Sequence, residues 1–263
     1  MREQSTEFVR LILTQEDFHV KDIEVCPNEK RADLLASYGS EEYIVEAKSR
    51  APHRGWNELM KQVWAEGCAT ISRHIDPWNA LSSTILEAYQ QLLSTPAPAE
   101  AFRVLWCVAL HDDGAFVKAC MEKRLIGTER LVAIEWSKAN MLDKPPEIID
   151  CYYHGSNDFE RCPKLDAAVI GTQEGGNLLI NMHSEQRARF RRSRLHAMFA
   201  KYNAVIDAEV AEQRGKAFML GRDFVGPRNG KSQWAYIRDR YGVGTSVMID
   251  NQFNAHMTYR ELP

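Results

Sequence analysis

The stretch from residue 31 to residue 50 alternates apolar and polar positions in two short runs, and Gly39-Ser40 lies between them. Alternation with a period of two predicts half-buried strands, and a Gly-X pair between two such runs predicts a tight hairpin. If Tyr38 pairs with Glu41 across this turn, the side chains fall on two faces. We expect one face to be core, and it holds Leu34, Ala36, Tyr38, Tyr43, Val45 and Ala47.

The other face of the hairpin carries charges that would repel one another. In the expected pairing Asp33 lies directly opposite Glu46, and Lys48 shares their face. Like charges placed opposite each other destabilise a hairpin, so a cation is expected there. Two converging carboxylates fit a hard divalent metal with oxygen ligands, and Lys48 supplies an ammonium that could act on a substrate. Alternatively, these residues are charges on a solvated sheet face, satisfied by a cross-strand salt bridge.

Apolar residues at helical spacing predict amphipathic helices along the chain. The predicted helices cover residues 6–15, 60–71, 79–93, 115–125 and 185–214. Runs rich in apolar, β-branched and aromatic residues predict strands. Beyond the hairpin, these strands cover residues 18–25, 102–110, 130–136, 148–153, 166–170 and 177–182. The helix between the strands 102–110 and 130–136 makes this segment a predicted β-α-β unit.

This order of elements predicts an α/β protein with a central mixed sheet flanked by helices and a basic helical C-terminal extension. Residues 1–140 would form the core, and residues 141–263 would continue the fold, so that the whole could be one compact domain. The 263 residues are 44% hydrophobic and 26% charged, which is typical of globular proteins. Because no apolar run is long enough to cross a bilayer, we expect no membrane association and a cytoplasmic location. The six cysteines are scattered without a C-x-x-C pair and indicate neither a zinc knuckle nor a disulfide framework.

Basic residues gather in the last third of the chain. Residues 187–240 contain thirteen Lys or Arg and five Asp or Glu, a local charge of +8 in a chain whose net charge is −3. Such a basic segment is typical of a phosphate-binding surface. On the predicted helix a basic stripe would face one way, formed by Arg187, Arg191, Arg194 and Lys201, and Arg228 and Lys231 add a basic and aromatic segment. A solvated helix face and the buried aromatic rings of a small subdomain are the alternatives.

The pattern Asp33, twelve residues, then Glu46-Ala47-Lys48 resembles the PD-(D/E)XK, or restriction-endonuclease-like, nuclease superfamily. The resemblance covers roughly the first half of the chain, with Ala32-Asp33 in place of the Pro-Asp of the family motif. It implies that Asp33, Glu46 and the backbone carbonyl of Ala47 hold Mg²⁺, for which Mn²⁺ would substitute. It also implies that Lys48 orients the attacking water or helps to deprotonate it.

Three further residues are weaker candidates for this site. The family often adds an acidic residue from the first helix, which suggests Glu7 as a further metal ligand, although a carboxylate at a helix start is the simpler interpretation. Some branches use a Gln beside the site, which suggests Gln90 or Gln62. Each of these two is otherwise an exposed residue of its predicted helix.

The resemblance implies a Mg²⁺-dependent deoxyribonuclease, an endonuclease rather than an exonuclease. Such nucleases act in restriction, repair or defence against phage DNA, often with a helicase or other motor protein, and many of them form homodimers. The sequence contains no phosphate-cradling Gly loop, so a motor would be a separate protein. Two alternatives remain, a non-catalytic nucleic-acid-binding or assembly subunit that retains the fold, and an RNA-directed nuclease.

Overall fold

The computed structural model describes most of the chain. The described residues are 2–24, 30–50, 56–66, 68–74, 79–111, 113–134, 147–227, 230–242, 245–249 and 252–258.

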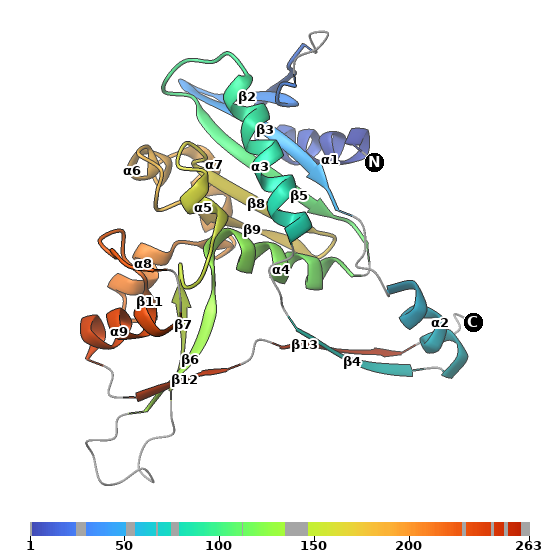
Figure 1. Cartoon of the computed structure of the whole chain (residues 1–263). Coiled ribbons are helices and arrows are strands. Elements are labelled where there is room, and N and C mark those ends of the chain that lie inside the picture. The colour runs from blue at the N-terminus through green and yellow to red at the C-terminus, as the bar shows by residue number, and fades with distance from the viewer. Residues whose placement is uncertain are drawn as a thin grey trace.

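A central mixed sheet of seven strands organises the fold, in the order β1-β2-β3-β5-β8-β9-β10 (Figure 1). Its strands are β1 (His19–Asp22), β2 (Leu34–Tyr38), β3 (Glu41–Ser49), β5 (Phe102–Ala109), β8 (Ala167–Thr172), β9 (Gly175–Ile180) and β10 (Val205–Ile206). The first three strands form an antiparallel meander, and β5 and β8 follow in parallel to β3. The sheet therefore takes strands from both sides of residue 140, and the expected α/β class with a central mixed sheet is confirmed.

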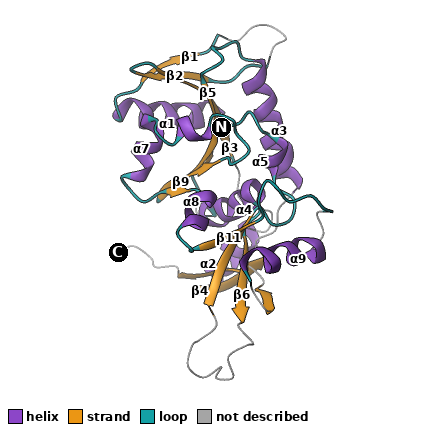
Figure 2. Cartoon of the chain, turned by 90° about the vertical axis from the view of Figure 1, so that its left-hand side faces the viewer, coloured by secondary structure: helices purple, strands orange, loops and turns teal. Residues whose placement is uncertain are grey.

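Helices cover both faces of this sheet (Figure 2). On one face, α1 (Arg2–Gln15), α6 (Arg187–Phe190) and α7 (Arg194–Ala200) bury apolar side chains against β2, β3 and β5. The opposite face is covered by α3 (Asn79–Ser94), α4 (Gly114–Ile126) and α5 (Asp158–Arg161). Because successive side chains of a strand point to opposite faces, every central strand contributes to two separate apolar clusters.

Two smaller sheets extend from the central one, toward the bottom of Figure 1. The first has four strands in the order β11 (Ala217–Met219), β7 (Glu147–Tyr152), β6 (Glu129–Ile134) and β12 (Thr245–Ile249). The second pairs β4 (Cys68–His74) with β13 (Gln252–Thr258). The helices α2 (Trp56–Glu66), α8 (Ala208–Gln213) and α9 (Gly230–Tyr241) complete the described elements. No helix in the described ranges is long and apolar enough to cross a membrane.

The predicted β-α-β unit is wrong in its second strand. The strand β6 leaves the central sheet and pairs antiparallel with β7 and β12, and β8 takes the place beside β5. The apolar composition of β6 predicts a buried strand but does not say against which partner, because strand propensity reflects packing context. The partner was decided by contacts between segments distant in the sequence.

The predicted helix over residues 60–71 ends early. The helix α2 stops at Glu66, and residues 68–74 form β4, which pairs over its whole length with β13 near the C-terminus. Trp64, an apolar residue of the predicted helix, is 60% exposed. Pairing with a distant strand has overridden the helical pattern in this segment.

The predicted long helix over residues 185–214 is also wrong, because it is divided into α6, α7 and α8. Ser193 accepts a hydrogen bond from the backbone of His196 and so caps α7, and Asp207 caps α8 in the same way through Val210. Between them Asn203 adopts a left-handed conformation with φ of 53°. Ser, Asp and Asn favour helix caps and turns over helix interiors, which is the physical reason for the division.

A buried ionic network joins three helices beneath the second face of the sheet. Asp158, at the start of α5, is fully buried and receives hydrogen bonds from Ser82 of α3 at 2.9 Å and from Arg124 of α4 at 2.8 and 3.0 Å. Arg161 adds a further contact of 3.1 Å. Removing one member of such a network leaves a charge buried without sufficient compensation.

We therefore expect Arg124→Met to lower the free energy of unfolding by about 3–5 kcal/mol, because Asp158 then loses its two-pronged partner. The matched control is Arg130→Met, since Arg130 is 60% exposed and lies 3.7 Å from Asp150. Arg130→Met should lower the free energy of unfolding by less than about 1 kcal/mol. Urea unfolding followed by circular dichroism measures both, and equal losses in the two variants would contradict the assignment.

Candidate active site

The hairpin of β2 and β3 has the register that the sequence predicts. Tyr38 pairs with Glu41 and Leu34 pairs with Val45, and Gly39 in the turn adopts a φ of 58°, which favours glycine. The expected core face is buried except at its tip, where Tyr38 is 39% exposed. This register places the charged residues of the hairpin together on the face covered by α3.

Asp33 directly precedes β2, and its side chain reaches across to β3. Its Oδ2 accepts a hydrogen bond from the backbone N–H of Ala47 at 2.9 Å, and its own N–H donates to the carbonyl of Val45 at 3.2 Å. The carboxylate is therefore directed at the segment that contains Glu46 and Lys48. This contact brings together the two parts of the motif, which are separated by twelve residues in the sequence.

Glu46 and Lys48 lie on the same face of β3, two positions apart, and are in direct contact. The Nζ of Lys48 is 2.6 Å from the Oε1 of Glu46 and donates a hydrogen bond to the Oε1 of Gln91, also at 2.6 Å. The Glu46 side chain is fully buried, whereas that of Lys48 retains 18% of its exposure. The ammonium is thus held in one position, between a carboxylate and an amide oxygen.

Gln91 is the residue that the sequence interpretation missed, by one position. It lies on α3, is 4% exposed, and donates through Nε2 to the carbonyl of Arg31 at 3.3 Å. Gln90, the residue proposed from the sequence, is exposed, which corrects that prediction. The helical spacing of Gln91 could have identified it as an inward-facing residue. Position 91 follows the buried Ala88 by three residues and precedes the buried Thr95 by four.

Glu7 and Gln62 also lie away from this site. Glu7 is 69% exposed and pairs with Arg10 on α1, the helix that covers the opposite face of the sheet. A side chain on that face cannot reach Glu46, because the sheet itself lies between them. Gln62 is exposed on α2, forms a hydrogen bond with Glu66, and belongs to a helix that packs against β4.

The neighbouring thiol is not a plausible nucleophile. Cys107 of β5 is the register partner of Lys48 and is buried on the same face. Burial raises the pKa of the Cys107 thiol to about 12, which outweighs the nearby Arg50 and Lys48. The thiol therefore stays protonated at neutral pH, and nucleophilic thiolate chemistry is not available at this position.

The oxygen atoms at this site fit Mg²⁺ in their chemistry. Asp33 and Glu46 offer hard carboxylate oxygens, and the residue that follows Glu46, Ala47, offers its backbone carbonyl. Within the described parts of the chain, no group of three or more His, Cys, Asp or Glu side chains is arranged to hold a metal. Mg²⁺ commonly binds through one or two carboxylates and keeps several waters, whereas structural Zn²⁺ sites need a full set of protein ligands.

The predicted nucleic-acid-binding stripe does not exist as one face. Arg187 pairs with Glu209 at 3.2 Å, and Arg191 pairs with Asp207 at 2.6 Å and with Glu209 at 2.5 Å. These acids follow in the sequence at positions that an unbroken helix would have kept apart from the arginines, and the division of the helix folds them back. The positive charges of Arg187 and Arg191 are therefore compensated within the chain.

The other basic candidates are dispersed. Arg194 pairs with Glu16 at 3.2 Å, and Lys201 is exposed with its Nζ 5.0 Å from the Tyr202 ring. Lys231 is exposed at the start of α9. Arg228 lies outside the described residues.

Comparison with family models, with curated proteins and with solved structures finds no match to this chain. A function is therefore inferred from the chain's own residues. We base this inference on the neighbouring polar residues Asp33, Glu46, Lys48 and Gln91.

Gln91→Ala should lower the free energy of unfolding by about 1–3 kcal/mol, because it removes buried hydrogen-bond partners from Lys48 and from the Arg31 carbonyl. The adjacent Gln90→Ala is the matched control and should change it by less than about 0.5 kcal/mol, since Gln90 is exposed. Chemical denaturation measures both. A larger loss for Gln90→Ala than for Gln91→Ala would contradict the assignment.

Proposed function

We propose that this protein is a metal-dependent nuclease that hydrolyses phosphodiester bonds in DNA. The observation that carries the proposal is the hydrogen bond from the Ala47 backbone to Asp33, which brings the first carboxylate to the Glu46-Ala47-Lys48 segment. The order of elements gives further support. The helix α1 and the antiparallel meander β1 to β3 are followed, after α2 and β4, by the helix α3 and the parallel strand β5. This order is consistent with a restriction-endonuclease-like core.

The chemistry of phosphodiester hydrolysis suits the residues present. A Mg²⁺ held by Asp33, Glu46 and the Ala47 carbonyl would neutralise charge on the phosphate oxygens, with Mn²⁺ as a substitute. Lys48 would position a water through its ammonium, whose direction is set by Glu46 and Gln91. Fixed charges of this kind act strongly because the site is shielded from solvent.

The site is largely buried, which limits how a substrate can enter it. Glu46 is fully buried, Lys48 retains little exposure, and Asp33 is half-buried. A phosphate would therefore approach from the side of Asp33, and α3 would have to shift before Glu46 could share a metal ion with it. We propose that DNA binding supplies this opening, in a restriction, repair or antiviral role, with a separate helicase or motor protein or a second copy of the chain as partner.

One observation favours a second candidate, a non-catalytic nucleic-acid-binding or assembly subunit that retains the fold. The direct contact of 2.6 Å between Lys48 and Glu46 satisfies both charges without a metal. If that ion pair persists in the presence of Mg²⁺ and DNA, the site stabilises the fold and does not catalyse hydrolysis. The two candidates differ in whether Mn²⁺ binds and whether any nucleic acid is cut.

We expect the purified protein to nick supercoiled plasmid DNA in Mg²⁺ or Mn²⁺ and not in EDTA. Asp33→Asn and Lys48→Met should each reduce the rate by about 10²-fold or more, because each removes a charged group from the reacting centre. The matched control is Glu42→Gln, since Glu42 lies on the same face of β3 but opposite Ser37, at the far end of the strand from Lys48. Its rate should stay within about twofold of that of the wild type.

Calorimetric titration with Mn²⁺ separates the candidates, with folding of each variant checked by circular dichroism. Binding that Asp33→Asn abolishes, together with cleavage, supports the nuclease. Mn²⁺ binding without cleavage of DNA or RNA overturns catalysis, and cleavage of RNA alone changes the substrate. Wild-type rates in both Asp33→Asn and Lys48→Met would remove these residues from the mechanism.

A further inference from the structure

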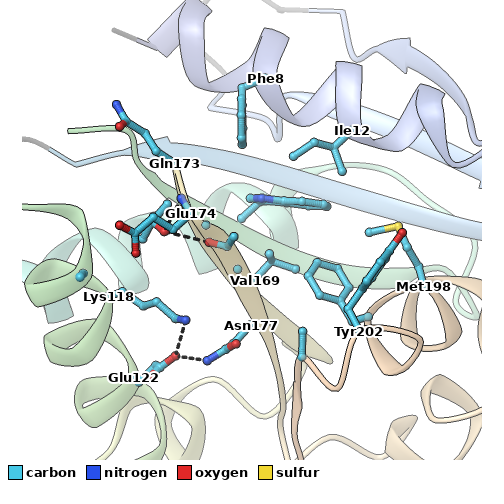
Figure 3. Close-up of a pocket in the computed structure, with 18 of the residues that line it drawn as sticks. Phe8, Ile12, Lys118, Glu122, Val169, Gln173, Glu174, Asn177, Met198 and Tyr202 are labelled. Carbon is cyan, nitrogen blue, oxygen red and sulfur yellow. Dashed lines mark hydrogen bonds and ion pairs between the residues drawn. The ribbon is translucent and has the colours of Figure 1, made fainter. Parts of the chain in front are cut away.

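A second site lies beside the hairpin of β8 and β9, and its Trp106 wall is on the face of the sheet opposite the candidate active site. It is a cavity of about 780 Å³ bounded by α1, α4, α7 and the hairpin of β8 and β9 (Figure 3). This volume is in the range of sites for small organic ligands. One wall is apolar and largely aromatic, formed by Phe8, Ile12, Trp106, Val169, Phe199 and Tyr202.

The opposite end of the cavity is polar. Lys118 and Glu122 lie one helical turn apart on α4, with Nζ and Oε1 3.9 Å apart, and Asn177 donates to Glu122 at 2.7 Å. Figure 3 shows these three side chains grouped on the side away from Phe8 and Ile12. Partial burial of the Glu122 side chain raises the pKa of its carboxyl group. A donor and acceptors are therefore presented side by side next to an aromatic wall.

Trp106 provides an independent indication of a ligand. It is 1% exposed, and its Nε1 has no hydrogen-bond partner among the described residues. A buried N–H group left in this state is unfavourable. Nε1 lies beside Gly171, which also lines the cavity, and a Cβ built on Gly171 would be 3.7 Å from it. A ligand acceptor seated beside Gly171 would satisfy this N–H after a small turn of the indole.

We propose that this cavity binds a nitrogen heterocycle of nucleobase or nucleoside size. The aromatic wall suits a flat ring, and the edge of such a heterocycle carries a donor next to an acceptor, which complements Lys118, Glu122 and Asn177. A purely apolar ligand would leave the polar end desolvated and unmatched. A small anion is disfavoured by the two carboxylates of Glu122 and Glu174 that line the cavity.

The position of Trp106 relates this cavity to the rest of the fold. Trp106 is the register partner of Ala47, and their side chains belong to the same apolar cluster, on the face opposite Glu46 and Lys48. A ligand against Trp106 is therefore separated from the candidate active site by one sheet layer. Ligand binding itself does not depend on the proposed nuclease activity, and its test needs no cleavage.

Binding can be measured by calorimetry on the full chain, with adenosine, guanosine, cytidine and uridine as probes and toluene as an apolar comparison. We expect at least one nucleoside to bind with a dissociation constant below about 1 mM, a value usual for a preformed site of this size. Gly171→Ala should weaken that binding about tenfold, because the added methyl group occupies the space beside Trp106. Lys118→Met should weaken it similarly by removing the polar partner.

The matched control is Gly230→Ala, at a described glycine outside the cavity with open space around its Cβ position, and it should bind as the wild type does. Near-ultraviolet circular dichroism checks that each variant keeps its packing. Absence of nucleoside binding, wild-type affinity in both Gly171→Ala and Lys118→Met, or toluene binding as tightly as the nucleosides would each overturn the proposal.

Discussion

The alternation of side chains along β3 is the constraint on which the rest of the structure depends. Tyr43, Val45 and Ala47 enter the apolar cluster under α1, so Glu46 and Lys48 must face α3. A shift of the register by one residue would exchange these sets, placing two charges in the apolar cluster. The apolar cluster thus holds the charged pair in position, and the hydrogen bond from Ala47 to Asp33 depends on the same register.

Burial holds the side chains of Glu46 and Lys48 in one arrangement and also limits the access of ligands to them. Desolvation strengthens the contacts of Lys48 with Glu46 and Gln91, and ordered charges of this kind are what a hydrolytic site requires. The same burial closes Glu46 to solvent, which is why the proposed metal binding requires a shift of α3. On the other face of the sheet, a cavity is lined by Trp106 of β5.

Intramolecular ion pairs engage Arg187, Arg191, Arg194 and Arg240 of the basic C-terminal region. Once Ser193 and Asp207 act as caps, the chain reverses and the acids after position 206 come to lie beside Arg187 and Arg191. Because Asp207 and Glu209 are already counted in the local charge of +8, these pairs change where the positive charge lies on the surface and not its total.

Local pattern and turn chemistry in the sequence determined the hairpin, its register at Gly39 and the convergence of Asp33 with the segment around Glu46, because these depend on neighbours in the chain. Only the tertiary structure decided that β6 leaves the central sheet, that residues 68–74 form a strand, and that Gln91 meets Lys48 in place of Gln90. Those outcomes depend on contacts between distant segments. The energies of these contacts exceed the small helix and strand propensities of the local sequence.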